Sequence, residues 1–247
     1  KAEEFQVPAA TSGDRGASIL AESFDAGIPG SWAVINNEPG SPIVWETWMT
    51  TNANTGVGRS NYTACGAGTD AAHVDSDAYG PGLEFDTELR TPVVDLSGFT
   101  DIVINAEINY QNLAGSDFLD IDVSSDGGGS WTNVLSWNED HPVGGLFVPP
   151  GEVIALDVTA EIGGSATAMV RFHYYDPNTN DFDWYAQVDC FEITGTPSEG
   201  ACCLNGPGTI TDCEVRAEAD CEPAGNHIFL GAGSTCDDIS CDELSAT

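Results

Sequence analysis

Apolar and polar residues alternate along several stretches of the chain between residues 22 and 196. In FLDIDV (118–123), Leu119, Ile121 and Val123 fall on one face of an extended strand, and the two aspartates fall on the other. Similar stretches rich in Val, Ile, Tyr, Phe and Trp are PIVWETWM (42–49), LEFDTELRTPVVDL (83–96), DIVINAEINYQ (101–111), SWTNVLSW (130–137), EVIALDVTA (152–160), AMVRFHYYD (168–176) and YAQVDCFEITG (185–195). Turn signals such as GPG, DLSG, PPG and IGG separate them, and no stretch keeps a 3.6-residue apolar period. The pattern predicts an all-β fold, an antiparallel two-sheet sandwich.

The Gly-rich stretch SSDGGGSW (124–131) could cradle a ligand or form the tip of a hairpin. Its Ser-x-Asp-x-Gly-x-Ser-Trp spacing matches the Asp-box pattern, in which the Asp side chain binds the amides of a turn and the Trp packs beneath. A phosphate-binding loop would need a following helix and a basic residue, and the stretch has neither. We therefore expect a hairpin between two strands.

Composition changes at both ends of the alternating region. Residues 1–21 are polar and small, with a short apolar patch at Phe5 and Val7, and predict an N-terminal extension. Residues 22–196 are expected to form the sandwich, and TGTPSEG (194–200) has the composition of a linker. Residues 197–247 are too few to bury much core, so we expect a small module stapled by disulfides.

The cysteines support this division and indicate an oxidising compartment. Six of the eight lie near the C-terminus and would make three bridges with 15 connectivities: Cys202, Cys203, Cys213, Cys221, Cys236 and Cys241. Zinc is the alternative, but no C-x₂-C pair occurs. Cys65 and Cys190 remain, and we expect them to pair within the sandwich. Disulfides on this scale, together with a start at Lys1 that lacks an initiator Met, predict a processed protein that is secreted or held at the cell surface.

The net charge of the chain limits the classes of molecule that it can bind. Forty Asp and Glu face six Lys and Arg, for a net charge of −34. Such a surface repels nucleic acid and anionic membranes and attracts divalent cations. No apolar run approaches the length of a membrane span.

No motif of an enzyme is present. The four histidines are scattered, with no H-E-x-x-H, and there is no G-x-S-x-G. Forty acids always permit a carboxylate pair, so a glycosidase stays open, but the sequence favours a protein that is not an enzyme. Trp137, Trp184 and Tyr185 are candidates for stacking on a glycan, although aromatic residues in sandwiches are more often core.

Acidic segments suggest a calcium site. ESFDAGIPGSW (22–32), GTDAAHVDSD (68–77) and QVDCFEI (187–193) each place carboxylates beside strands. Ca²⁺ takes six to eight oxygen ligands, and such segments could supply them if they converge. In so acidic a chain, the alternative is that all of these carboxylates are solvated.

Four stretches, taken in order, carry a family resemblance: ESFDAGIPGSWAVINN, ELRTPVVDLSGFTDIVINAEINY, DFLDIDVSSDGGGSWTNV and MVRFHYYD…WYAQVDCFEI. Over residues 20–195 the chain resembles the MAM-like jelly-roll domains of secreted bacterial proteins, which include the cleaved-adhesin and choice-of-anchor J domains. The resemblance implies a jelly roll whose first and last strands lie close together, commonly around Ca²⁺.

Matched by position, the resemblance assigns calcium ligands to Glu22, Asp25 and Asp189. Cys190 stands where the family often has a second Asp, so Asp75 or Asp77 would complete the shell. The tail resembles a short Cys-rich repeat found near the ends of secreted bacterial proteins.

Two functional hypotheses follow. The first is a structural subunit of a surface filament or layer, a homopolymer in which EEFQV of one copy adds a strand to the next, with Phe5 and Val7 in pockets. The alternative is an adhesin module of a larger secreted protein that binds glycans or surface proteins.

Overall fold

The computed structural model describes residues 16–48, 61–63, 70–113, 115–144, 149–177, 183–206, 209–217, 221, 228–232, 234 and 236. Phe5, Val7, Cys65 and Cys241 lie outside this part of the chain, so the predictions made for them stay predictions. The contacts divide the protein into a larger unit, built from Ser18–Ser97 and Asp101–Thr194, and a smaller one that contains the C-terminal part from Gly195.

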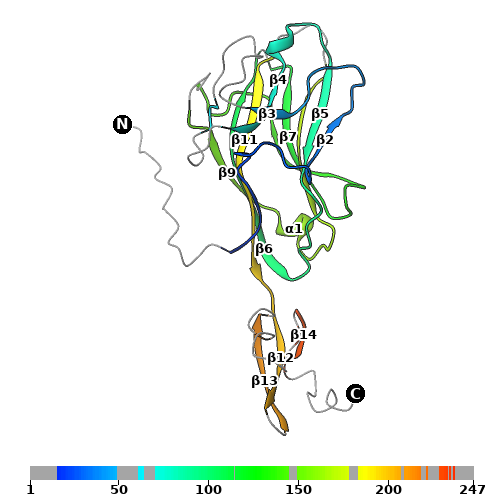
Figure 1. Cartoon of the computed structure of the whole chain (residues 1–247), viewed down its shortest axis with the longest axis vertical. Helices are drawn as coiled ribbons and strands as arrows, with labels where there is room; N and C mark the ends of the chain where they lie inside the picture. The colour runs from blue at the N-terminus through cyan, green and yellow to red at the C-terminus, as the bar shows by residue number, and fades with distance from the viewer. Residues whose placement is uncertain are drawn as a thin grey trace, which may run out of the picture. The chain divides into compact units, whose positions relative to one another are not determined.

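Two antiparallel sheets form the larger unit (Figure 1). In the first sheet the order is β3 (Glu46–Trp48), β4 (Ala71–Asp75), β11 (Tyr185–Pro197), β6 (Phe99–Gln111) and β9 (Glu152–Asp157), and β1 (Ala17–Glu22) also pairs with β11. In the second the order is β2 (Ala33–Asn36), β5 (Phe85–Arg90), β10 (Met169–Asp176), β7 (Phe118–Ser124) and β8 (Thr132–Trp137). A 3₁₀ turn, η1 (Asp77–Tyr79), and a short helix, α1 (Thr159–Ile162), lie in the connections. The predicted two-sheet jelly-roll sandwich is confirmed.

Strand β10 shows how alternation produces the two faces of the second sheet. Val170, Phe172 and Tyr174 are buried, whereas the residues between them are half-buried on the opposite face. Since successive side chains of a strand point to opposite faces, the apolar set packs against the first sheet and the other set faces outward. The sequence MVRFHYYD therefore contributes both to the core and to a surface.

Aromatic rings connect the two sheets in the core. The Phe172 ring on β10 lies 5.8 Å from that of Phe191 on β11, edge to face, and 6.4 Å from that of Trp45. Trp32 lies 5.2 Å from Phe191 and 5.1 Å from Phe24. Such edge-to-face pairs add to the free energy gained by burying the rings. Phe24 has a backbone φ of 54°, which its packing against Trp32 compensates.

The Gly-rich stretch is the predicted turn between β7 and β8. Asp126 accepts hydrogen bonds from the Ser130 amide at 2.8 Å and from the Ser124 hydroxyl at 2.7 Å. These bonds hold the pKa of the Asp126 carboxyl down, at about 2. Gly128, at φ 87°, lies against Trp131, and an added Cβ would come within 3.3 Å of that ring. The side chains of this stretch thus stabilise the turn.

In the smaller unit, β12 (Glu199–Gly206) lies between β13 (Thr209–Ala217) and β14 (Ile228–Ala232). Disulfides join Cys202 to Cys221 and Cys213 to Cys236, which confirms a stapled C-terminal module and fixes two bridges that the sequence left open. Cys190 and Cys203 are also disulfide-bonded. In the described part of the chain, no helix is long and apolar enough to cross a membrane.

We expect Phe172→Ala to lower the free energy of unfolding of the larger unit by about 3–5 kcal/mol, because it removes a fully buried ring that contacts both sheets. Urea denaturation followed by tryptophan fluorescence measures the change. Val153→Ala, at a position 74% exposed in β9, is the control and should change stability little. Equal effects of the two substitutions would contradict this core.

Candidate binding surface

The outer face of the second sheet carries charged and aromatic side chains in register. Those of β10 stand beside outward residues of β5 on one side and of β7 on the other. The cross-strand trios are Arg90, Arg171 and Asp122; Glu88, His173 and Asp120; and Asp86, Tyr175 and Phe118. Alternation in FDTELR, MVRFHYYD and FLDIDV therefore assembles one continuous surface, which we call the β10 face.

Glu88 is the centre of an ion network on the β10 face. Its carboxylate accepts hydrogen bonds from Arg90 Nε at 2.5 Å, Arg171 Nη1 at 2.8 Å and Asn37 Nδ2 at 2.8 Å. Burial alone would raise the pKa of Glu88, but the bonds from Arg90 and Asn37 and the charge of Arg171 hold it below the usual range. Arg171 Nε also binds Asp122 Oδ2 at 2.8 Å. The positions of these side chains are therefore fixed before any ligand arrives.

Trp131 extends the network at the hairpin. The guanidinium of Arg171 lies 4.6 Å from the centre of its ring, and that of Arg90 lies 5.2 Å away. Cations at this distance are attracted to the electron-rich face of an indole. The Asp-box turn thus contributes to the surface by holding a tryptophan against both arginines.

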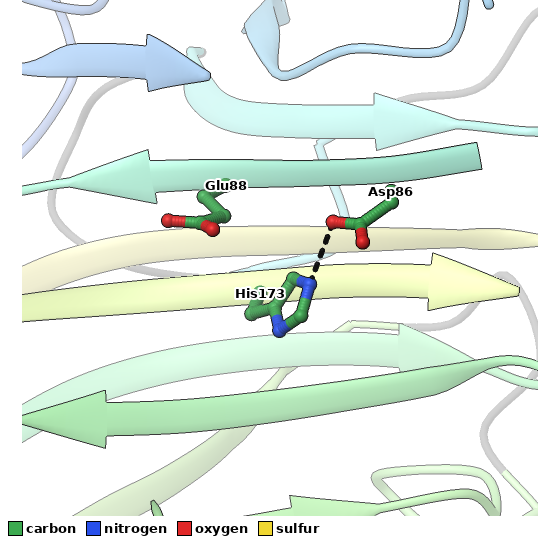
Figure 2. A group of neighbouring side chains, drawn as sticks. All are labelled: Asp86, Glu88 and His173. Atoms are coloured by element: carbon green, nitrogen blue, oxygen red, sulfur yellow. Dashed lines mark hydrogen bonds and ion pairs between the residues drawn. The ribbon is translucent and has the colours of Figure 1, made fainter. Parts of the chain in front are cut away.

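His173 and Asp86 form the polar centre of the face (Figure 2). His173 Nε2 lies 2.8 Å from Asp86 Oδ1, and Asn37 Nδ2 donates to the same oxygen at 2.8 Å. The Asp86 side chain is 41% exposed, so a ligand could reach it from solvent. A ligand could accept or donate hydrogen bonds here.

Three rings continue the β10 face toward the end of β10. The Tyr175 ring stacks with that of His173, with centroids 4.5 Å apart, and with that of Phe118, with centroids 5.3 Å apart. Its hydroxyl donates to Asp120 Oδ2 at 3.2 Å, and burial together with the Asp120 charge raises the pKa of Tyr175 to about 12. Tyr175 is half-buried, so part of it remains exposed on the β10 face.

Asp86, Glu88 and His173 place one ligand atom each within 4.8 Å of one another, which is the spacing of a metal site. Both oxygens of Glu88 are, however, already bonded to guanidinium groups. A metal cation there would have to displace Arg90 and Arg171, two of the few positive charges in the chain. We conclude that this group is an organised polar surface and that a metal is disfavoured.

The structure places three of the predicted calcium ligands in one region. Since β1 pairs with β11, Glu22 at the end of β1 and Asp25 just after it lie near Asp189. Glu22 and Cys190 line a cavity of about 450 Å³. Burial, with a smaller effect from the charge of Asp25, raises the pKa of Asp189. Phe24 and Cys190 both have positive φ, at 54° and 42°, so strained backbone flanks the region.

Asp75 and Asp77 are not brought to this region. Asp75 lies opposite Tyr185 on β11, and Asp189 is four residues farther along the strand, about 13 Å away. Asp77 begins η1, where its amide donates to the Trp184 carbonyl at 3.3 Å. The expected completion of the shell by either residue has no geometric support among the described residues.

The outer face of the first sheet is polar but covered. Tyr62 crosses it: its amide donates to Gln187 Oε1 at 2.7 Å, its carbonyl accepts from Asn109 at 3.2 Å, and its ring lies 5.6 Å from that of Tyr185. Thr63 Oγ donates to Asp189 Oδ2 at 2.7 Å. Segment 61–63 therefore occupies the face that Tyr185 would offer to a glycan.

The aromatic residues predicted to stack on a glycan are not coplanar neighbours. Tyr185 is fully buried on the first sheet, whereas Trp137 ends β8 on the second, 8% exposed and stacked on His141 at 3.7 Å. Trp184 is half-buried and precedes β11. The sequence identified aromatic candidates, but it could not show which faces of the two sheets are covered by other residues.

No protein-family model and no curated protein matches this chain. The similar solved structures include two cleaved adhesin domains of Lys-gingipain from Porphyromonas gingivalis W83. The K1 domain is 21% identical with a TM-score of 0.48, covering 72% of this chain and 98% of that domain. The K3 domain is 19% identical with a TM-score of 0.48, covering 72% and 99%. A carbohydrate-binding module specific for non-crystalline cellulose is 13% identical with a TM-score of 0.42, covering 73% and 96%.

Cleaved adhesin domains are thus among the similar structures, whereas the resemblances to the MAM and choice-of-anchor J types and to the Cys-rich repeat stay predictions. At these scores the similarity assigns no function to this chain. The function has to be argued from its own side chains.

We expect Glu88→Gln to lower the free energy of unfolding at neutral pH by about 1–3 kcal/mol, because two guanidinium groups lose a charged acceptor. The folded pKa of Glu88 lies below its unfolded value, so this contribution is complete above pH about 4.5 and is lost as the pH falls through the folded pKa. Urea denaturation at several pH values should show the difference between the proteins narrowing in acid. The exposed Glu84→Gln is the control, and a gap that persists unchanged in acid would contradict the assignment.

Proposed function

We propose that the chain is a non-catalytic extracellular module that binds a glycan through the β10 face. The supporting observation is the fixed set of hydrogen-bonding groups around His173 and Asp86, next to the rings of Tyr175 and Phe118. Polyhydroxy ligands are recognised by planar polar groups placed beside apolar rings. Side chains already held by neighbours lose little entropy on binding, so weak individual contacts can still give useful affinity.

The charge of the face limits the class of glycan. Four carboxylates (Asp86, Glu88, Asp120 and Asp122) stand beside two guanidinium groups, which are paired with Glu88 and Asp122. The chain as a whole carries −34. Sulfated and uronic-acid glycans would be repelled, so neutral or amino sugars are the expected ligands.

The β10 face suits a glycan better than a large apolar partner. The exposed large hydrophobic residues of the described chain are dispersed over several elements, for example Val93, Val143 and Val153. A protein interface needs a contiguous apolar centre. The filament hypothesis depends on residues 1–15, outside the described part of the chain, and nothing in the described residues favours it over glycan binding.

A glycan array probed with the intact chain tests this proposal. We expect neutral or amino-sugar glycans to bind, and His173→Ala or Asp86→Asn to weaken binding at least tenfold, because each removes a group at the polar centre. His141→Ala, which alters a histidine stacked on Trp137, is the matched control. An array without signals, or variants that bind as well as the wild type, would overturn the β10 face as a glycan site.

We also propose that Glu22, Asp25 and Asp189 bind Ca²⁺. Three carboxylates offer only oxygen donors, which suits a hard cation. The fit is partial, because Asp189 already accepts hydrogen bonds from Thr63, Asn61 and the Cys190 amide. Glu22 and Asp25 would supply the remaining charge, and the cation would hold the end of β1 against β11.

We expect Ca²⁺ at 100 times its Kd to stabilise the wild type by about 2.7 kcal/mol, and Asp25→Asn to lose most of this gain, since it removes one ligand. Thermal melts in CaCl₂ and in EDTA measure the shift. Asp95→Asn, an exposed carboxylate bonded to Ser97, is the control and should keep the full shift. A wild-type melt that EDTA leaves unchanged would exclude a structural cation.

A further inference from the structure

The two ends of the β10 face differ in the hydrogen bonds that they offer. At one end Arg90 and Arg171 bring N–H donors, which are bonded to carboxylates. The other end consists of four side chains on the neighbouring strands β5, β10 and β7: Asp86, Asp120, His173 and Tyr175. We call these four the acceptor end. Arg171 and Tyr175 are four residues apart on β10, so the two ends lie about 13 Å from each other.

The two aspartates of the acceptor end can only accept hydrogen bonds when they are ionised. Asp86 Oδ1 accepts from His173 and from Asn37, both at 2.8 Å, and the Asp86 side chain is 41% exposed. Asp120 Oδ2 accepts from the Tyr175 hydroxyl at 3.2 Å. Among the described residues, Asp120 Oδ1 has no hydrogen-bond partner. Each carboxylate therefore keeps acceptor capacity, and a positive charge nearby would stabilise both.

His173 and Tyr175 are acceptors as well. A carboxylate cannot donate, so the proton between His173 Nε2 and Asp86 belongs to the imidazole (Figure 2). In the neutral imidazole the other ring nitrogen is then an acceptor. The Tyr175 hydroxyl gives its single proton to Asp120 and keeps its lone pairs for another partner. A ligand at the acceptor end therefore has to supply donors.

The charges around Tyr175 favour a cation. Burial is the largest cause that raises the pKa of Tyr175 to about 12, and the charge of Asp120 comes next. The charges of Asp122 and Asp86 add to this effect. Carboxylates that oppose a negative charge on the hydroxyl also attract a positive charge placed beside it. The field at this point of the face therefore agrees with the hydrogen-bonding pattern.

Among the groups that sugars carry, a free amine fits the acceptor end best. A hydroxyl or an N-acetyl amide donates one hydrogen bond and brings no charge, whereas an ammonium has three N–H donors and a full positive charge. Hydrogen bonds between charged groups are also the stronger ones. The half-buried rings of Tyr175 and Phe118 supply the apolar contact that a sugar ring needs beside these acceptors.

We propose that the β10 face binds a glycan with unacetylated amino groups, and that an ammonium group of this glycan donates hydrogen bonds at the acceptor end. The inference rests on the glycan-binding function proposed above and narrows the ligand from neutral and amino sugars to cationic amino sugars. The arginines at the opposite end do not repel the ammonium strongly, since their charges are paired with Glu88 and Asp122.

Calorimetric titration of the intact chain with two oligosaccharides of equal length, one of glucosamine and one of N-acetylglucosamine, tests the inference. At pH about 7 the carboxylates are ionised and most of the amines are protonated. We expect the glucosamine oligomer to bind about tenfold more tightly or better, and this advantage to shrink at high salt. Equal affinities would overturn the inference and leave glycan binding intact. Binding of neither oligomer would also overturn it, and the glycan array decides the broader function separately.

A matched pair of variants separates the acceptor end from the acidic surface as a whole. Asp120→Asn keeps the size of the side chain and removes its charge, so we expect the affinity for the glucosamine oligomer to fall about fivefold or more. Asp95→Asn removes the same charge from an exposed carboxylate that is bonded to Ser97, and it should bind like the wild type. Equal losses in the two variants would assign the binding to the overall charge of the chain and overturn the inference.

A competition experiment needs no variant and stays decisive if Asp120→Asn folds poorly. Lysine side chains also carry an ammonium group, but they lack the sugar ring that would contact Tyr175 and Phe118. We expect a lysine-containing peptide to displace the glucosamine oligomer from the wild type only at much higher concentration. Displacement at equal concentration would assign the acceptor end to the ammonium groups of a protein and overturn the amino sugar as its ligand.

Discussion

Positive charge is scarce in this protein, and this scarcity governs how its carboxylates are stabilised. With forty acids and six basic residues, most carboxylates have no cationic partner within the chain. Where carboxylates are solvated this costs little, because water screens them. Where strands bring them into contact, the charge has to be compensated locally. Binding sites are therefore expected where the structure brings carboxylates into contact and their negative charge has to be balanced.

The β10 face and the buried aspartates Asp117, Asp176 and Asp183 show two environments in which the protein holds carboxylates. On the β10 face, two arginines bind Glu88 and Asp122, whereas Asp86 and Asp120 are bonded to His173 and Tyr175, so the face keeps an excess of carboxylates. Inside the sandwich, Asp117 accepts a hydrogen bond from Asn112 and Asp183 accepts one from Ser116, and both carboxylates are buried. The same strand, β10, contributes to both because its alternation sends Arg171 outward and Asp176 inward. One strand therefore supplies both an outward polar surface and a buried carboxylate.

The sequence predicted the strands well and the convergence of side chains poorly. Alternation in FLDIDV and MVRFHYYD specifies which residues share a face, and the Asp-box spacing specifies the turn, because both are local properties. Which strands become neighbours is not local. Asp86 and His173 meet because β5 pairs with β10, and Asp75 is separated from Asp189 because it pairs opposite Tyr185. Alternation predicted which residues of β5 and β10 face outward, but it did not predict that these two strands are neighbours in the sheet.

Burial of polar groups was the other property that the sequence could not supply. Tyr185 is of a residue type that stacks on glycans, yet Tyr62 lies over it. In the sequence, Asp117 resembles a surface aspartate before a strand, yet in the structure it is fully buried. A buried carboxylate has to be stabilised by hydrogen bonds, protonation or positive charge, whereas solvent stabilises an exposed one. Composition and motifs therefore locate acidic segments, but only the folded structure shows which of their carboxylates are removed from solvent.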